Sequence, residues 1–535
     1  MRSLIHVFSA SLIIAFGLIT RAFALEIPLY DKFEAELLHT GSPQNPYKQI
    51  SAQVTFTQPD GATVSIPMFW DGGNTWRVRL SPWMVGRWTY TTSSSDAGLN
   101  NQSGEFDCIP STNKGALTQK ADAAYHFAYQ DGTPVWWFGD TNWYQFASLP
   151  TENLNHETAN AYIDTRSAQG FNVVHAMLYT RRGNEGGAPF SNMKSESINP
   201  AFFREIDSRL AHMNERGVTA GLVLAWGFGD GSWLDFPSAE ARLRFARYAV
   251  ARYSAYNVYF LASAEWGLFP RAKGDARSFF RPIAEMVAAT DPHHRLLGIH
   301  ADPFHSQSEP FADEAWSSFG DYQQFYGRPP RQQLATDASR DVLAKRLADA
   351  RDHGKPVVNG EYAYYMRDRN GDGIGDKENS RNVTEFRKAS WVLAMTGGYF
   401  VTGFGSTYRG GTNDPGGFDY AKPSNNEAVA NLVLLRSFFQ SFPWWTLEPR
   451  NDLVSGKGYH YALALPGQTY LVYTTSSAPV TLSLDNAEPG AYFVKSFDPR
   501  TGTYTPIPGY VGNGTITLTP PTNEDWAFVV QRAVN

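Results

Sequence analysis

Two glutamates, each at the end of an apolar, strand-like run, are the residues of this sequence best suited to chemistry. Glu265 follows residues 260–264, Glu361 follows residues 355–360, and an aromatic residue comes directly after each of them. A pair of carboxyl groups flanking a glycosidic bond can cleave it, because one protonates the leaving oxygen while the other attacks the anomeric carbon or activates water. The pair therefore indicates chemistry on a sugar, although either glutamate alone would equally fit a salt-bridged residue at a strand end.

The elements around these glutamates alternate between strand and helix patterns from about residue 134 onward. Residues 201–216 and 239–254 are typical of helices, and such alternation predicts a parallel sheet built from βα units. Eight strands separated by helices favour a closed (β/α)8 barrel, or TIM barrel, over an open sheet, and catalytic groups gather at the C-terminal strand ends of such a barrel. The eight expected strands cover residues 134–139, 171–177, 219–226, 258–263, 295–300, 318–322, 356–359 and 399–403.

The strand count assigns different roles to the two glutamates. Glu265 closes the fourth expected strand and Glu361 closes the seventh. This order resembles the large superfamily of retaining barrel glycosidases, in which the acid/base follows strand four and the nucleophile follows strand seven. The resemblance implies that Glu265 is the general acid/base, with a raised pKa, and that hydrogen bonds keep Glu361 ionised as the nucleophile.

Other polar and aromatic residues at the expected strand ends would line the mouth of the barrel. Tryptophans there could stack on sugar rings, the acid and the histidines could bind hydroxyl groups, and a tyrosine on strand six could hydrogen-bond the nucleophile. Each of them would equally fit a purely structural role. The candidate substrate-binding residues are Asp140, Asn142, Trp143, His175, Trp226, His300, Tyr322 and Tyr362.

A second motif, residues 368–376, has the spacing of a calcium-binding loop. Asp368, Asn370, Asp372 and Asp376 supply oxygen atoms at positions 1, 3, 5 and 9, with glycine at position 6. Asn379 stands at position 12, where such loops carry a bidentate glutamate. The loop is either a structural calcium site or an unliganded acidic surface loop, and no cofactor is expected for catalysis.

All-β segments flank the predicted barrel. Short alternating strands separated by Pro/Asp/Gly turns run through residues 25–118 and again through residues 447–535. Both segments are predicted to be β-sandwiches, which leaves residues 119–446 for the barrel. The fold class expected is therefore multidomain, with a central barrel between two all-β sandwiches.

The N-terminus and the overall composition indicate where the protein is located and which classes of partner it can bind. Residues 1–24 read as a signal peptide, with Arg2 before an apolar stretch and a small-residue cleavage site ending at Ala24. We expect a periplasmic or secreted protein without stable membrane insertion after signal removal; a retained signal anchor is the alternative. The net charge of −6 provides no basic field for nucleic acid. The single cysteine, Cys108, lies in a strand-like run that predicts burial.

The quoted strand ends resemble those of the apiosidase-like barrel glycosidases. The resemblance rests on residues 136–143 (WWFGDTNW), 170–174 (GFNVV), 221–227 (GLVLAWG) and 359–361 (NGE). The flanking segments are similar to a β-sandwich of unknown function and to a collagen-binding-type sandwich, the latter through residues 496–502 and Asp525-Trp526. The resemblance implies a retaining, exo-acting or branch-cleaving glycosidase. It departs at strand four, where Ala264 stands in the position at which related clans carry Asn before the acid/base.

The leading hypothesis is a secreted retaining glycoside hydrolase that acts on a polysaccharide or oligosaccharide through two glutamates. A non-catalytic carbohydrate-binding protein built on an inactive barrel is the alternative, and the distance between the two carboxyl groups distinguishes them. A third hypothesis treats the C-terminal sandwich as a protein-adhesion module.

Overall fold

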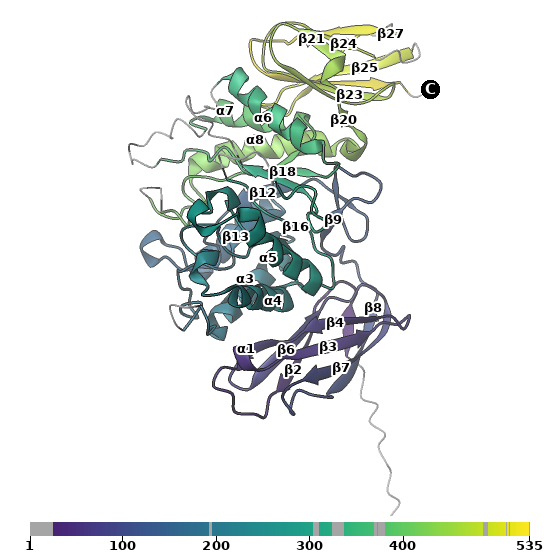
Figure 1. The fold of residues 1–535 in the computed structure, drawn as a ribbon. Helices are drawn as coiled ribbons and strands as arrows, with labels where there is room; N and C mark the ends of the chain where they lie inside the picture. The colour runs from purple at the N-terminus through teal and green to yellow at the C-terminus, as the bar shows by residue number, and fades with distance from the viewer. Residues whose placement is uncertain are drawn as a thin grey trace, which may run out of the picture.

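The computed structural model places a barrel between two β-domains (Figure 1). The N-terminal domain lies below the barrel in this view and the C-terminal domain above it. Both the barrel and its flanking antiparallel sheets agree with the predicted fold class. The structure describes residues 25–191, 195–302, 310–323, 336–368, 372, 380–412, 414, 416–484, 490–509, 511–512 and 514–533.

Eight parallel strands form the barrel wall, in the order β16-β15-β14-β13-β12-β19-β18-β17. Hydrogen-bonded ladders join all neighbours along this path, and no ladder joins β16 to β17 within the described residues, so the barrel is nearly closed. Glu265 follows the fourth strand and Glu361 ends the seventh, as the strand count predicted. The strands are β12 (Phe138–Thr141), β13 (Val173–Met177), β14 (Thr219–Val223), β15 (Val258–Leu261), β16 (Leu297–Gly298), β17 (Gly320–Gln323), β18 (Val357–Glu361) and β19 (Tyr399–Val401).

The first strand begins later than the sequence predicted. Pro134–Val135 is a separate strand, β11, which pairs antiparallel with β10 (Phe127–Tyr129) outside the barrel wall, and β10 also pairs with β9 (Leu117–Gln119). Residues 134–139 are almost uninterruptedly apolar, so periodicity could not reveal the break. Phe127 packs on Trp137 with ring centroids 4.7 Å apart, which joins this small sheet to the barrel interior.

Helices cover the outer face of the barrel. Asn or Ser side chains cap the N-termini of several of them, for example Asn155 before α2 and Ser238 before α4, where they accept backbone N–H groups that have no partner within the helix. The two predicted helices are confirmed as α3 and α4, but the described residues between β16 and β17 form no α-helix. The helices are α2 (His156–Ala168), α3 (Pro200–Glu215), α4 (Ala239–Tyr253), α5 (Ala276–Thr290), α6 (Asp337–Arg351), α7 (Val383–Met395) and α8 (Pro423–Gln440).

The N-terminal domain consists of two facing sheets, antiparallel except where β1 pairs parallel with β8, around an apolar core that includes Cys108, which is 2% exposed as predicted. A charged cluster attaches it to the barrel: Arg79 donates to Asp207 of α3 at 2.8 Å, and Arg252 of α4 donates to Asp71 at 2.9 Å. The strands are β1 (Glu26–Pro28), β2 (Phe33–Leu38), β3 (Ala52–Thr57), β4 (Thr63–Pro67), β5 (Phe69–Gly72), β6 (Thr75–Leu80), β7 (Gly86–Ser94) and β8 (Ser103–Ile109); helix α1 is Pro46–Gln49.

The C-terminal domain packs on α7. Arg387 of that helix donates to Asp525 at 2.8 Å, and Tyr473 donates to the same buried carboxylate at 3.0 Å. Asp525, part of the motif that resembles collagen-binding-type domains, is therefore buried between domains. The strands are β20 (Glu448–Pro449), β21 (Val454–Gly456), β22 (His460–Leu465), β23 (Thr469–Thr474), β24 (Val480–Ser483), β25 (Gly490–Phe497), β26 (Tyr504–Ile507), β27 (Val511–Gly512), β28 (Thr515–Leu518) and β29 (Trp526–Arg532).

The signal-peptide prediction falls on residues 1–24, which lie outside the described residues. Within the described part of the chain, none of the helices has the length and apolar character needed to cross a membrane.

Candidate active site

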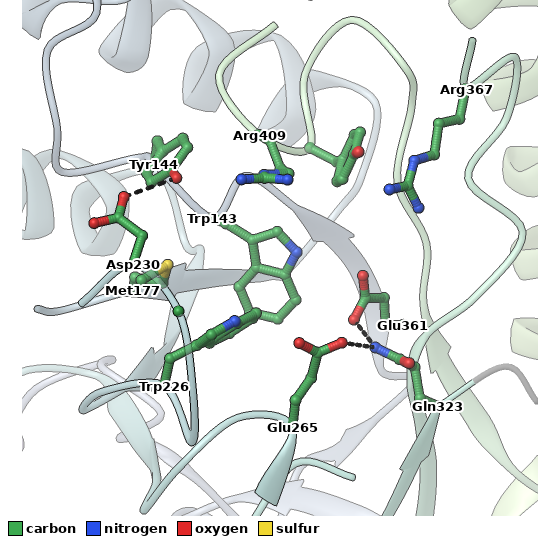
Figure 2. Close-up of a pocket in the computed structure, with 12 residues that line it drawn as sticks. Trp143, Tyr144, Met177, Trp226, Asp230, Glu265, Gln323, Glu361, Arg367 and Arg409 are labelled. Carbon is green, nitrogen blue, oxygen red and sulfur yellow. Dashed lines mark hydrogen bonds between the residues drawn. The ribbon is translucent and has the colours of Figure 1, made fainter. Parts of the chain in front are cut away.

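Glu265 and Glu361 meet in one pocket at the C-terminal end of the barrel strands (Figure 2). The cavity has a volume of about 250 Å³. Aromatic side chains form much of its wall, and charged groups converge on it. Its lining residues are Trp143, Tyr144, Met177, Trp226, Gly229, Asp230, Glu265, Gln323, Glu361, Arg367, Tyr408 and Arg409.

Three hydrogen-bond donors surround the Glu361 carboxylate. His300 Nε2 lies 3.2 Å from Oε2, Gln323 Nε2 donates to the same oxygen, and the Tyr364 hydroxyl donates to Oε1. Trp143 Nε1 in turn donates to the Tyr364 hydroxyl at 2.9 Å, so the tryptophan that lines the cavity and the carboxylate are linked. Burial raises the pKa of Glu361, but the hydrogen bond and charge of His300 and the Tyr364 hydrogen bond more than offset it and leave the pKa below its ordinary value.

A buried ion pair keeps His300 charged. Its Nδ1 lies 2.7 Å from Asp321 Oδ1, and both side chains are fully buried. Burial lowers the pKa of His300, but the carboxylates of Asp321 and Glu361 outweigh this effect and raise it to about 10. An imidazolium therefore faces Glu361 at neutral pH. Gly360 leaves room for this pair, because a Cβ there would come within 2.4 Å of Asp321 Oδ2.

Glu265 has the opposite electrostatic environment. Burial, and then the charge of Glu361, raise its pKa from 4.5 to about 7. Its backbone adopts the left-handed conformation, with φ 46° and ψ 49°, which is uncommon for a residue other than glycine and is found at functional sites. Near neutral pH the pair therefore consists of one carboxyl that can carry a proton and one that is ionised.

The side-chain amide of Gln323 lies between the two carboxyl groups. Its Nε2 is 3.5 Å from Glu265 Oε1 and also donates to Glu361 Oε2. The register between β17 and β18 shifts at Tyr322/Gln323, so that Gln323 pairs with Glu361. Irregularities of this kind change the direction of side chains next to active sites. Here the irregularity occurs where the side chains of Gln323 and Glu361 both point into the barrel interior. Two oxygens within reach of one amide nitrogen lie within about 6 Å of each other.

Two of the predicted substrate-binding residues line the pocket, and two lie beside or below it. Trp143 and Trp226 both form its wall, with ring centroids 5.1 Å apart in an edge-to-face arrangement. His300 contacts Glu361 as described, so it acts on that carboxylate. His175 lies inside the barrel, 5.7 Å from the Trp143 ring, and burial holds its pKa well below the ordinary value.

The other four predicted residues do not line the pocket. Asp140 accepts hydrogen bonds from Arg166 and Tyr162 of α2, so it faces the helix layer. Asn142 donates to Gln145, three residues further along its own loop. Both are fully buried, and neither is available to bind sugar hydroxyls in this arrangement.

The two tyrosines in this group also point away from the pocket. Tyr362 bonds to Ser390 and stacks on Phe386, both in α7. Tyr322 is buried and lies between Asp321 and Gln323, whose side chains face the barrel interior. Because side chains alternate along a strand, the Tyr322 side chain faces the opposite way. The tyrosine that donates to the nucleophile candidate is Tyr364, which corrects the role expected for Tyr322.

Several pocket residues were not among the predicted substrate-binding residues. Arg367 follows strand seven, Asp230 follows strand three and Arg409 follows strand eight. Tyr364 also follows strand seven and, although it is not a lining residue, bonds to Glu361. The Arg367 guanidinium packs over the Tyr408 ring at 4.7 Å, and its charge helps to lower the pKa of Glu361. Position after a barrel strand was the only available signal, and it applies equally to many loop residues that lie elsewhere.

The proposed calcium ligands are only partly described. Asp368 is 7% exposed and Asp372 is exposed, whereas Asn370 and Asp376 lie outside the described residues. In the described part of the chain, no group of three or more His, Cys, Asp or Glu residues could hold a metal ion.

Comparison with known families identifies the barrel. The model of the apiosidase-like catalytic domain matches residues 121–446. The chain belongs to this family. Residues 26–95 match a domain of unknown function, and residues 449–531 match the "putative collagen-binding domain of a collagenase". A comparison with curated protein sequences gives no match.

Solved structures share the fold at low sequence identity. A "putative glycoside hydrolase" from Bacteroides vulgatus has a TM-score of 0.74 at 20% identity, covering 95% of this chain and 100% of the other. A family 5 glycoside hydrolase from the same organism has a TM-score of 0.64 at 16% identity, covering 78% and 94%. Family membership and fold together support a glycoside hydrolase.

Proposed function

We propose that this protein is a secreted retaining glycoside hydrolase in which Glu361 is the nucleophile and Glu265 is the general acid/base. The observation that carries the proposal is the Gln323 amide within reach of both carboxyl groups. Retaining enzymes need carboxyl groups ~5–5.5 Å apart, whereas inverting enzymes need ~6.5–9.5 Å to admit a water molecule. Sharing one amide nitrogen favours the shorter separation.

The opposite pKa shifts support the same roles. In the first step Glu361 attacks the anomeric carbon, the glycosidic C–O bond breaks, and Glu265 gives its proton to the departing oxygen. In the second step Glu265 takes a proton from water, whose oxygen attacks the anomeric carbon and releases Glu361. The raised pKa of Glu265 lets it carry the proton that the first step requires, and the lowered pKa of Glu361 keeps the attacking carboxylate ionised.

Product release from a panel of plant, algal and microbial polysaccharides tests the activity. Glu361→Gln should abolish release, and Glu265→Gln should lower it most for substrates with poor leaving groups. Glu285→Gln is a matched control, because Glu285 is an exposed helix residue that pairs with Arg281. The anomer formed first, observed by proton NMR, should have the configuration of the substrate. Inversion, or full turnover by Glu361→Gln, would refute the mechanism.

Glycan binding without product release would instead support the non-catalytic alternative. Secretion is tested by fractionation and N-terminal sequencing, which should find a mature chain that begins at Leu25. Calcium in residues 368–376 remains part of the proposal as a structural ion, because oxygen ligands at this spacing suit calcium.

A further inference from the structure

An exposed phenylalanine belongs to the loop that borders the pocket. Phe228 is 53% exposed, whereas its neighbours in sequence Trp226, Gly229 and Asp230 line the cavity. A single exposed aromatic residue needs no special explanation by itself, so its position on a loop that lines the cavity is what points to a role for Phe228 in binding. None of the roles assigned above uses this side chain.

The loop that carries Phe228 is closed by its own backbone. Trp226 N–H donates to the carbonyl of Gly231 at 2.9 Å, and Trp233 N–H donates back to the carbonyl of Trp226 at 3.0 Å. Gly229 and Gly231 have φ angles of 100° and 68°, which favour glycine and permit so tight a turn. Phe228 is therefore held near the tip of a fixed loop, so little conformational entropy is lost when a ligand packs on it.

The loop lies on the acid/base side of the pocket. Gly227 N–H donates to the carbonyl of Ala264 at 2.8 Å, and a Cβ on Gly227 would meet the Glu265 carbonyl oxygen at 2.8 Å. Figure 2 shows Trp226 and Asp230 to the left of Glu265, with Gln323 and Glu361 to its right. The general acid protonates the leaving oxygen, so the leaving group lies on its side of the scissile bond.

Charged groups border the same loop. Asp230 accepts from Arg181 N–H at 3.1 Å and from the Tyr144 hydroxyl at 3.0 Å, and Arg182 lies 3.4 Å from it. The side chains of Arg181 and Arg182 are 57% and 54% exposed. A sugar suits this loop, because its C–H face can pack on an exposed ring while its hydroxyls bond to the exposed guanidinium groups, which are paired with Asp235 and Asp230.

We propose that Phe228 is the platform on which the sugar ring of the leaving group stacks, directly beyond the scissile bond. The inference rests on the proposed function, since it takes Glu265 as the acid that protonates this leaving group. It assigns the protein a substrate class in which the departing unit is itself a sugar, as in an oligosaccharide or polysaccharide, and not a small alkyl group. Phe228 is thus a specificity-determining residue.

The test compares two substrates made from the sugar that the panel identifies: an oligosaccharide and the glycosyl fluoride, whose leaving group has no ring. Phe228→Ala should lower the ratio of oligosaccharide to fluoride kcat/KM about 3- to 10-fold, the range that one aromatic contact supplies. Phe228→Trp should restore the ratio. Phe493→Ala is the matched control, because Phe493 is 65% exposed in the C-terminal domain. An unchanged ratio in Phe228→Ala would overturn the inference.

A binding measurement separates this inference from the proposed function. In affinity electrophoresis through gels that contain each polysaccharide of the panel, Glu361→Gln protein should be retarded by one of them. Adding Phe228→Ala should reduce that retardation, whereas adding Phe493→Ala should not. Equal retardation of both double variants would refute the platform even if the protein proved non-catalytic. Reduced retardation without any turnover by the wild type would refute the hydrolase, and with it the leaving-group role, and would leave Phe228 as a glycan-binding residue.

Discussion

The raised pKa of Glu265 has two causes that one substitution separates. Burial is the larger cause and the Glu361 charge the second, and together they bring the pKa from 4.5 to about 7. Two unit charges about 6 Å apart interact by roughly 3 kcal/mol at an effective dielectric constant of 20. The His300 imidazolium remains nearby and opposes the carboxylate charge. In Glu361→Gln we therefore expect the pKa of Glu265 to fall by up to about two units, the equivalent of ~3 kcal/mol, and to stay above 4.5 because burial, the larger cause, persists.

The assay is a pH titration of the Glu265 carboxyl carbon by NMR in protein labelled with ¹³C-glutamate, assigned by its absence in Glu265→Gln. Glu285→Gln should leave the titration unchanged. In the wild type, kcat/KM should fall as pH rises through about 7, because Glu265 loses the proton that it must donate. A Glu265 pKa that is unchanged in Glu361→Gln would refute the coupling between the carboxyls, and a fall to 4.5 or lower would refute the burial effect.

Three further predictions concern the nucleophile, the domain contact and the acidic loop. His300→Gln removes the cation beside Glu361, so the pKa of Glu361 should rise and the acid limb of the kcat/KM profile should move to higher pH; an unmoved limb would contradict this. Arg387→Met removes the hydrogen-bonded cation of the buried Asp525 carboxylate and leaves it the longer Arg500 contact at 3.8 Å, so it should cost up to about 3–5 kcal/mol, seen as a lower thermal midpoint that Arg387→Met/Asp525→Leu partly restores. If residues 368–376 bind calcium, a chelator should lower the midpoint and excess calcium should restore it. The calcium site would be refuted if the chelator left the thermal midpoint of the wild type unchanged and the Asp368→Asn variant melted at the same temperature as the wild type.

Much of the barrel could be predicted because its signals are local. Strand-like runs that alternate with helix patterns specify βα units, and parallel strands place all their C-terminal ends at one rim. Counting the runs was therefore enough to bring Glu265 and Glu361 to the same end of the barrel. The error at residues 134–139 shows the limit, since a continuous apolar run contains no sign of where one strand stops and the next begins.

The partners of the glutamates could not be predicted in this way. Whether a residue faces the barrel interior depends on strand register, and a shift of one residue reverses every side chain. Asp140 and Tyr362 therefore had the right position along the chain but face the helices. Gln323 faces Glu361 across a register shift that no local pattern encodes.

The sequence by itself determined the order of the elements, the residue types at the strand ends and the identity of the two carboxyl groups, because each depends on short-range periodicity. Only the tertiary structure decided their protonation. The raised pKa of Glu265 and the lowered pKa of Glu361 arise from burial and from charges on strands far apart in the chain. Two glutamates that look alike in the sequence thus differ in chemistry because the barrel hydrogen-bonds an imidazolium and a tyrosine hydroxyl to Glu361, whereas burial and the Glu361 charge dominate at Glu265.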